Sequence, residues 1–175
     1  MRGDRQDKKM TKDKKEGNIG KWPKAATEKF SSYGKKFAGK FSPKKSVKSF
    51  RDLDVYRISM ELSLDVSKFI IPALEEEGYP LIEGMRNSSL SIPLFIADSH
   101  SIRFSDFDKG VATLERAMQS CNKMVVYLEQ SMGLYTKEVD VVLVEDLMKK
   151  YITVRGKMFR LMKAWKAWQA TKRNY

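Results

Sequence analysis

A run of apolar residues at alternating spacings of four and three constrains this chain more than any other feature. The residues are Phe107, Val111, Leu114, Met118, Cys121, Val125, Leu128 and Met132. This repeat places one apolar stripe along an α-helix. Ser105 with Asp108 is a capping pair for its beginning, and Gly133 is expected to close it in a left-handed conformation. The chain must therefore bury this stripe against other helices.

Two helices are expected before this one. The first opens near Ser49, which with Asp52 forms a capping-box pattern, and its apolar stripe runs through residues 55–69. The following sequence, IPALEEEGYP, is expected to end it as a loop, because it contains two prolines and a glycine. The second helix spans residues 81–99 and contains Pro93, which removes one backbone hydrogen bond.

A fourth helix is expected from Thr136 to about Ala170, with an apolar face that follows the same spacing. The four segments predict an all-α fold for residues 50–175. About 125 residues suffice for one compact core. Residues 1–49 form a basic, aromatic-containing tail that is expected to be disordered until it meets a partner.

The positive charge of the chain is concentrated at its two ends. The net charge is +12, residues 1–50 carry 16 Lys/Arg and 5 Asp/Glu, and residues 51–146 carry 9 Lys/Arg and 17 Asp/Glu. Residues 147–175 carry 9 basic residues and no acid. Two basic segments that flank an acidic region are suited to a polyanion, so nucleic acid and an anionic membrane surface are the first candidate partners.

The candidate nucleic-acid-binding residues lie in these two basic segments. In the tail, aromatic side chains suited to base stacking alternate with lysines that neutralise phosphates; these are Trp22, Phe37, Phe41, Lys35, Lys36, Lys40, Lys44, Lys45 and Lys48. In the fourth helix, five basic residues fall roughly opposite the apolar face; these are Lys149, Lys150, Lys157, Arg160 and Lys163. The sequence predicts that both groups contact RNA or another nucleic acid.

The tail has two further interpretations. Aromatics that dip into an interface and lysines that meet acidic headgroups also suit a membrane surface. Alternatively, the aromatics dock the tail onto the domain or onto another protein. The composition of the tail does not separate these three uses.

Catalytic chemistry is not indicated. The chain has one His and one Cys, which argues against zinc sites rich in these residues and against nucleophilic dyads. Cys121 occupies a core position of the apolar repeat, and a buried thiol is expected there. Asp98, Ser99 and His100 are consecutive, so their side chains point in different directions on a helix and cannot form a catalytic triad. We expect no enzymatic activity, no metal and no cofactor.

The N-terminus is charged and lacks the apolar run of a secretory signal. No stretch approaches 18 uncharged apolar residues, so no membrane-spanning helix is expected. A single Cys excludes an intramolecular disulfide. These features are typical of a cytoplasmic protein.

Residues 50–166 resemble a bacterial family of four-helix bundle proteins encoded inside intervening sequences of 23S ribosomal RNA genes. The resemblance is carried by SFRDLDVY at residues 49–56, SIPLFIADS at 91–99, FSDFDKGVATLERAM at 104–118, LEQSMGLYT at 128–136 and RGKMFRLMKAW at 155–165. Ser99 and His100 replace the glycine and aromatic residue typical of the family, and the basic tail is an addition.

The resemblance implies an antiparallel up-down four-helix bundle, frequently a homopentamer, with no assigned enzymatic activity. The family is similar to the accessory variability protein of diversity-generating retroelements, a basic pentamer that binds the reverse transcriptase and its template RNA. The intervening-sequence type and the retroelement accessory type both remain open, and the second implies a reverse transcriptase as a partner.

Oligomerisation is also expected from the residues themselves. Tyr56 and Met60 in the first helix, and Trp165 and Trp168 in the fourth, extend beyond the single apolar stripe that a bundle helix requires. Exposed apolar patches of this kind usually mark an interface. We therefore predict a homo-oligomer.

Overall fold

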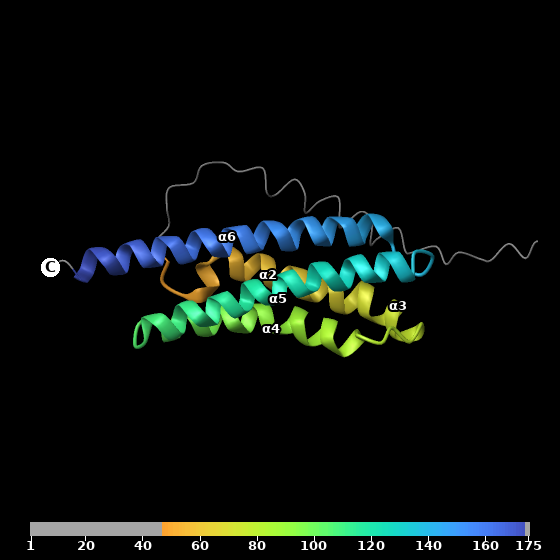
Figure 1. The fold of residues 1–175 in the computed structure, drawn as a ribbon, viewed down its shortest axis with the longest axis horizontal. Helices are drawn as coiled ribbons and strands as arrows, with labels where there is room; N and C mark the ends of the chain where they lie inside the picture. Colours follow the sequence, from red (N-terminus) through yellow and green to blue (C-terminus); the bar gives the residue numbers. More distant parts are fainter. Residues whose placement is uncertain (1–46, 174–175) are drawn as a thin grey trace, which may run out of the picture. The chain divides into compact units, whose positions relative to one another are not determined.

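The helix predicted from the apolar repeat is α5, Phe107–Leu134. The computed structural model describes residues 47–173 (Figure 1). The N-cap is Asp106 and not Ser105, since the Oδ1 atom of Asp106 accepts a hydrogen bond from the backbone nitrogen of Lys109 at 3.0 Å. The left-handed cap predicted at Gly133 is also wrong. The helix continues through Gly133, and the backbone of Tyr135 still donates to Ser131 at 2.9 Å.

The capping box at Ser49 is present, but it caps the start of a short 3₁₀ turn, Phe50–Asp52, ahead of the main helix. α2 spans Asp54–Asp65. It continues without a break into a π-helical segment, Val66–Ile70, and then into α3, Ile71–Glu76. Residues 71–76 were expected to be a loop, and this expectation is wrong.

The π-helical segment explains why Pro72 does not end this helix. Ile71 donates its backbone N–H to the carbonyl of Val66, five residues earlier. The wider turn resets the hydrogen-bond pattern, so that Pro72 lies in the first turn of α3, where its missing N–H costs little. The chain turns at Gly78 instead, which has a φ of 68°, a conformation that favours glycine.

α4 spans Ile82–Ile102 and continues through Pro93. It ends three residues later than predicted. α6 spans Val141–Arg173 and begins five residues later than predicted. Asp140 caps it, because its Oδ1 atom accepts from the backbone nitrogen of Leu143 at 3.1 Å. Val139 is buried just before this cap, and the turn that carries it into the core delays the start of the helix.

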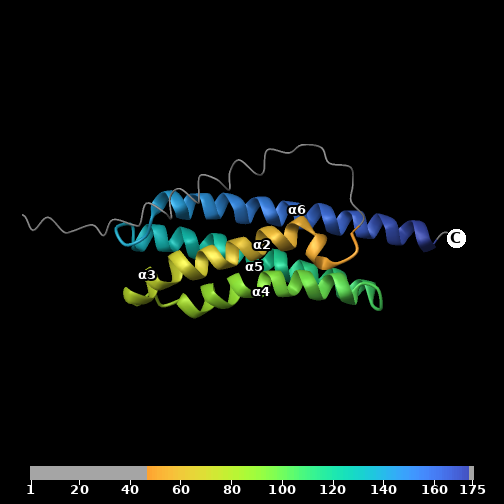
Figure 2. The ribbon, with the colours of Figure 1, turned by 180° about the vertical axis from the view of Figure 1, so that it is seen from behind.

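The helices pack in a closed arrangement in which α2 contacts α4 and α6, and α5 contacts the same two helices (Figures 1 and 2). The described residues contain no strand and belong to one compact unit, Ser46–Tyr175. The core holds long aliphatic side chains from every helix; fully buried examples are Leu62, Ile70, Leu74, Met85, Ile92, Ile96, Leu114, Met124, Leu128 and Leu147. None of the described helices is long and apolar enough to cross a membrane.

Buried serines allow the helices to approach closely. Ser59, Ser99 and Ser131 each donate a hydrogen bond to a carbonyl of their own helix, at 2.6–2.9 Å. Ser89 on α4 instead meets Tyr151, which extends from α6 through the core, with 3.2 Å between the two hydroxyl oxygens. This bond joins the two helices on opposite sides of the arrangement.

Candidate nucleic-acid interface

The predicted basic residues of α6 lie along its solvent side, and we call this set the α6 basic face: Lys149, Lys150, Lys157, Arg160 and Lys163. Lys149, Arg160 and Lys163 are exposed, whereas Lys150 and Lys157 are half-buried at the flanks. This distribution follows from the 100° rotation per residue, which carries the three exposed residues opposite the buried Tyr151, Val154 and Met158.

Two members of the α6 basic face are paired with acids of the preceding turn. The Nζ atom of Lys149 lies 3.4 Å from a carboxylate oxygen of Glu145, and the Nζ atom of Lys150 lies 2.6 Å from one of Asp146. Lys150 also acts on Asp65 of α2: burial raises the pKa of Asp65, and the positive charge of Lys150 opposes this shift. Lys150 is therefore held among carboxylates.

The other three members have no ion pair within the part of the chain that the structure describes; these are Lys157, Arg160 and Lys163. The Nζ atom of Lys163 lies 4.8 Å from the centre of the Phe159 ring. Phe159 is 41% exposed beside these cations, and Ile152, two turns earlier on α6, is 58% exposed. Among the described residues, the members of the α6 basic face without an ion pair are thus those toward its C-terminal end, next to the exposed Phe159 ring.

Most of the predicted tail residues lie outside the described residues; these are Trp22, Lys35, Lys36, Phe37, Lys40, Phe41, Lys44 and Lys45. Lys48 is described and its side chain is exposed, while its backbone nitrogen donates to Asp52 at 3.0 Å. Lys48 therefore stands at the start of the folded domain.

Trp165 does not belong to the exposed apolar surface to which the sequence analysis assigned it. It is 6% exposed, and the guanidinium of Arg103 lies 4.4 Å from its ring centre. Arg103 also covers Phe104 at 4.4 Å. Trp168 is 48% exposed, as predicted. Trp165 is buried because Arg103, in the connection between α4 and α5, covers its ring.

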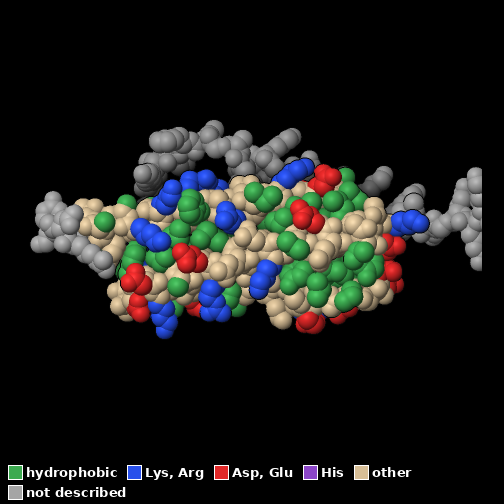
Figure 3. All heavy atoms as spheres, viewed as in Figure 1, with side chains coloured by type: hydrophobic (Ala, Val, Ile, Leu, Met, Phe, Trp, Pro, Cys, Tyr) green, Lys and Arg blue, Asp and Glu red, His purple; other side chains and the backbone are tan. Residues whose placement is uncertain are grey.

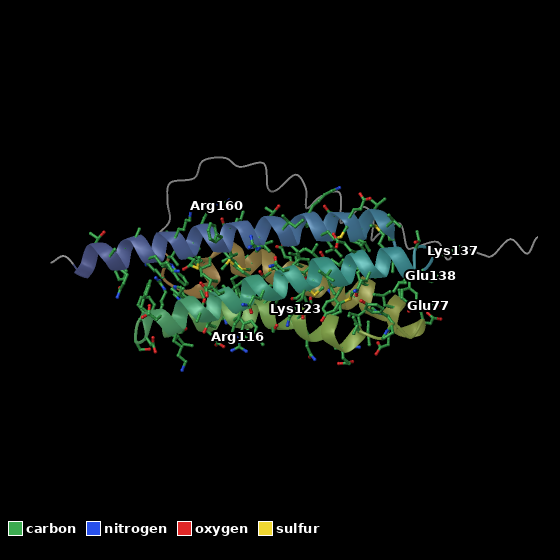
Figure 4. The ribbon with its side chains drawn as sticks, in the orientation of Figure 1. Glu77, Arg116, Lys123, Lys137, Glu138 and Arg160 are labelled. Carbon is green, nitrogen blue, oxygen red and sulfur yellow. The ribbon has the colours of Figure 1, made fainter. Side chains whose placement is uncertain are left out.

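Cations on α5 received no role from the sequence analysis, because they lie in the acidic part of the chain. Lys109, Arg116 and Lys123 are all exposed and are spaced by seven residues, so they share one side of α5. Figure 4 shows Arg116 and Lys123 along the boundary between α4 and α5, whereas Arg160 lies on α6. The spacing of seven was a signal that could have identified this stripe.

The side chains that resembled catalytic groups do not form a site. Ser99 donates to the carbonyl of Ile96 at 2.9 Å and not to His100, and Asp98 is exposed. Burial raises the pKa of Cys121 to about 12, so its thiol stays protonated at neutral pH and the predicted buried thiol is confirmed. In the described residues, no group of three or more His, Cys, Asp or Glu is arranged to hold a metal ion.

Comparison of the chain with protein-family models, with curated proteins and with solved structures finds no match.

Proposed function

We propose that this chain is a non-catalytic RNA-binding protein whose α6 basic face contacts phosphates together with the basic tail. The observation that carries the proposal is the run of Lys157, Arg160 and Lys163, which has no carboxylate partner among the described residues. A cation without an acidic neighbour retains its attraction for phosphate and releases counterions when a polyanion binds.

The test is the salt dependence of RNA binding by the full chain. For single strands, the logarithm of the association constant falls with the logarithm of salt concentration by about 0.7 per phosphate contact. Changing Lys157, Arg160 and Lys163 together to Gln removes three contacts and is expected to reduce this slope by about 2. Fluorescence anisotropy with a labelled single-stranded RNA, between about 50 and 200 mM salt, measures it.

A matched control removes the same charge elsewhere. Arg57, Lys68 and Arg86 each lie beside an acid: Arg57 pairs with Asp54, Arg86 with Glu75, and Lys68 acts on Asp65. Changing these three to Gln should leave the slope close to that of the unmodified chain. Equal slopes for both triple variants, or binding that does not depend on salt, would refute a role for the α6 basic face.

A second candidate function is binding to an anionic membrane surface. It is favoured by Phe159, which is exposed next to Arg160 and Lys163, because interfacial helices combine apolar and basic side chains in this way. Flotation with vesicles of acidic lipids separates the candidates. If the protein floats with the vesicles after nuclease treatment and does not bind RNA, binding to the membrane surface is supported.

Homo-oligomerisation is part of the proposal. Its support is a set of exposed apolar side chains on α5, on α4 and at the N-cap of α4, namely Leu81, Leu90, Leu94, Val126 and Leu134. Figure 3 shows hydrophobic side chains gathered toward the α3 end of the molecule. Light scattering on residues 50–175 tests it, and a folded monomer would refute it. A pentamer is the number that the family resemblance implies.

The resemblance to the 23S intervening-sequence proteins supports an antiparallel up-down topology, and their similarity to the retroelement accessory protein, which binds template RNA, supports RNA binding. The short connections at residues 103–106 and 135–140 suit antiparallel neighbours. If the chain is instead a retroelement accessory protein, its partners are a reverse transcriptase and the template RNA. Co-purification with the product of a neighbouring reverse transcriptase gene distinguishes the two types.

A further inference from the structure

A polar groove between α4 and α5 carries two cations and no acid. Asn87, Ser91 and Phe95 line it from α4, while Arg116, Gln119 and Lys123 line it from α5, and its volume is about 260 Å³. None of the described side chains that line it is Asp or Glu. Pockets that enclose a drug-sized ligand measure about 300–1,000 Å³, so this groove accommodates one part of a larger ligand.

Arg116 forms a flat, charged platform in this groove. Its guanidinium carbon lies 4.6 Å from the centre of the Phe95 ring, so a side chain of α4 holds a side chain of α5 in place by a cation–π contact. Arg116 is exposed and has no ion pair among residues 47–173. Unpaired bases of RNA stack on guanidinium planes and on aromatic rings.

The remaining polar groups suit the other parts of a nucleotide. Asn87 and Gln119 are exposed, one on each helix, and each amide offers both donors and an acceptor for a base edge. Lys123 follows Arg116 by two helical turns, about 10.5 Å along the axis, and supplies a positive charge for a phosphate. The groove thus presents a stacking plane, two amides and a separate cation.

We propose that this groove binds one nucleotide unit, with its base on Arg116 and Phe95 and its phosphate at Lys123. The nucleotide can belong to RNA, in which case the inference rests on the proposed function, or it can be a free mononucleotide with the same chemistry. A base stacked in the groove must be unpaired. The groove therefore adds a contact that requires an unpaired nucleotide, whereas the α6 basic face contacts phosphates only.

The experiment follows the side-chain amides of Asn87 and Gln119 by NMR in the isotope-labelled full chain. Adenosine 5′-monophosphate is added up to millimolar concentrations and compared with adenosine and inorganic phosphate. We expect the nucleotide to shift both amide signals and to bind more tightly than either fragment, because it contacts Arg116 and Lys123 together. If neither the mononucleotide nor a short single-stranded RNA shifts the two amide signals, the proposal is overturned.

Variants assign the contact. Arg116→Gln is expected to weaken binding about fivefold, which corresponds to the low end of the energy of one stacked base. Arg116→Lys should lose most of this energy, because it keeps the charge but not the plane. Arg57→Gln, which removes one positive charge from a residue paired with Asp54 on α2, is the control. These side chains are exposed, so the fold should persist, as circular dichroism will show.

The outcomes separate this inference from the proposed function. RNA binding that Arg116→Gln leaves as strong as Arg57→Gln does would overturn the groove while leaving the RNA-binding function intact. Binding of the mononucleotide without binding of RNA would support the groove as a site for free nucleotides and refute the proposed function.

Discussion

Gly110 lies where the connection between α4 and α5 presses against the first turn of α5, and its replacement by Ala is expected to destabilise the protein. A Cβ atom on Gly110 would lie 2.7 Å from the Cα and Cβ atoms of Arg103 and 2.8 Å from its backbone nitrogen. Two of these three atoms are backbone, so they cannot move aside as a flexible side chain can. Arg103 is also held between Phe104 and Trp165.

The magnitude follows from two opposing terms. Overpacking costs about 1–3 kcal/mol, and the close backbone contact indicates the upper part of this range. Ala gains at most about 1 kcal/mol over Gly in a helix. Gly110→Ala should therefore lower the free energy of unfolding by about 1–2 kcal/mol. At this chain length, that change lowers the melting temperature by about 2–4 °C per kcal/mol.

Gly156→Ala is the matched control. Gly156 lies inside α6, and a Cβ atom there would meet only the Nη1 atom of Arg160, at 3.9 Å. This variant should stabilise the protein by about 0.5–1 kcal/mol. Urea denaturation followed by far-ultraviolet circular dichroism measures both variants. If Gly110→Ala stabilises the protein as much as Gly156→Ala does, the close contact between Gly110 and Arg103 is refuted.

Three further predictions follow from other sites. Tyr151→Phe and Ser89→Ala should each lower the free energy of unfolding by about 1–3 kcal/mol, because each leaves a buried hydroxyl unpaired. In a double-mutant cycle, the double variant should be more stable than the sum of the two single effects predicts. Additive effects would argue against the 3.2 Å contact. Burial, with the charge of Arg103, lowers the pKa of His100 from its ordinary 6.5. The folded state therefore binds fewer protons than the unfolded state, and stability should fall as pH drops below about 6.5, by no more than about 1.4 kcal/mol per pH unit. In denaturant titrations, His100→Gln should lose less stability than the unmodified chain between neutral and mildly acidic pH. An unchanged pH profile would contradict this. Gly133→Ala should stabilise α5 by about 0.5–1 kcal/mol, whereas a loss of stability on thermal melting would restore the left-handed cap.

The existence and type of the helices could be predicted because amphipathic periodicity is a local property. The repeat through Leu114, Met118 and Cys121 defines a buried stripe whichever helices cover it, and α5 therefore appears nearly where it was expected. The helix ends were less predictable. Gly133 allows either a cap or a continuation, and Pro72 ends a helix only if no π-helical turn resets the hydrogen bonds before it.

The candidate site could be predicted only as a set of charges. The sequence indicates that α6 is basic, but Lys149 and Lys150 pair with Glu145 and Asp146 one turn earlier. These two acids lie at the end of the acidic segment, residues 51–146, so the charge of each segment does not reveal the pairing. Arg116 was overlooked because its block is acidic on average. Average charge over many residues does not report which side chains face one another.

What the sequence by itself determined is the helical class, the apolar faces and the position of the basic segments, since these depend on residues within a few turns. Only the tertiary structure decided which cations remain unpaired, which tryptophan is covered and which glycine has no room for a side chain. Arg116 on Phe95, Arg103 on Trp165 and Tyr151 at Ser89 each join different segments of the chain. Such contacts depend on how the helices pack, and packing places residues together that sequence spacing keeps apart.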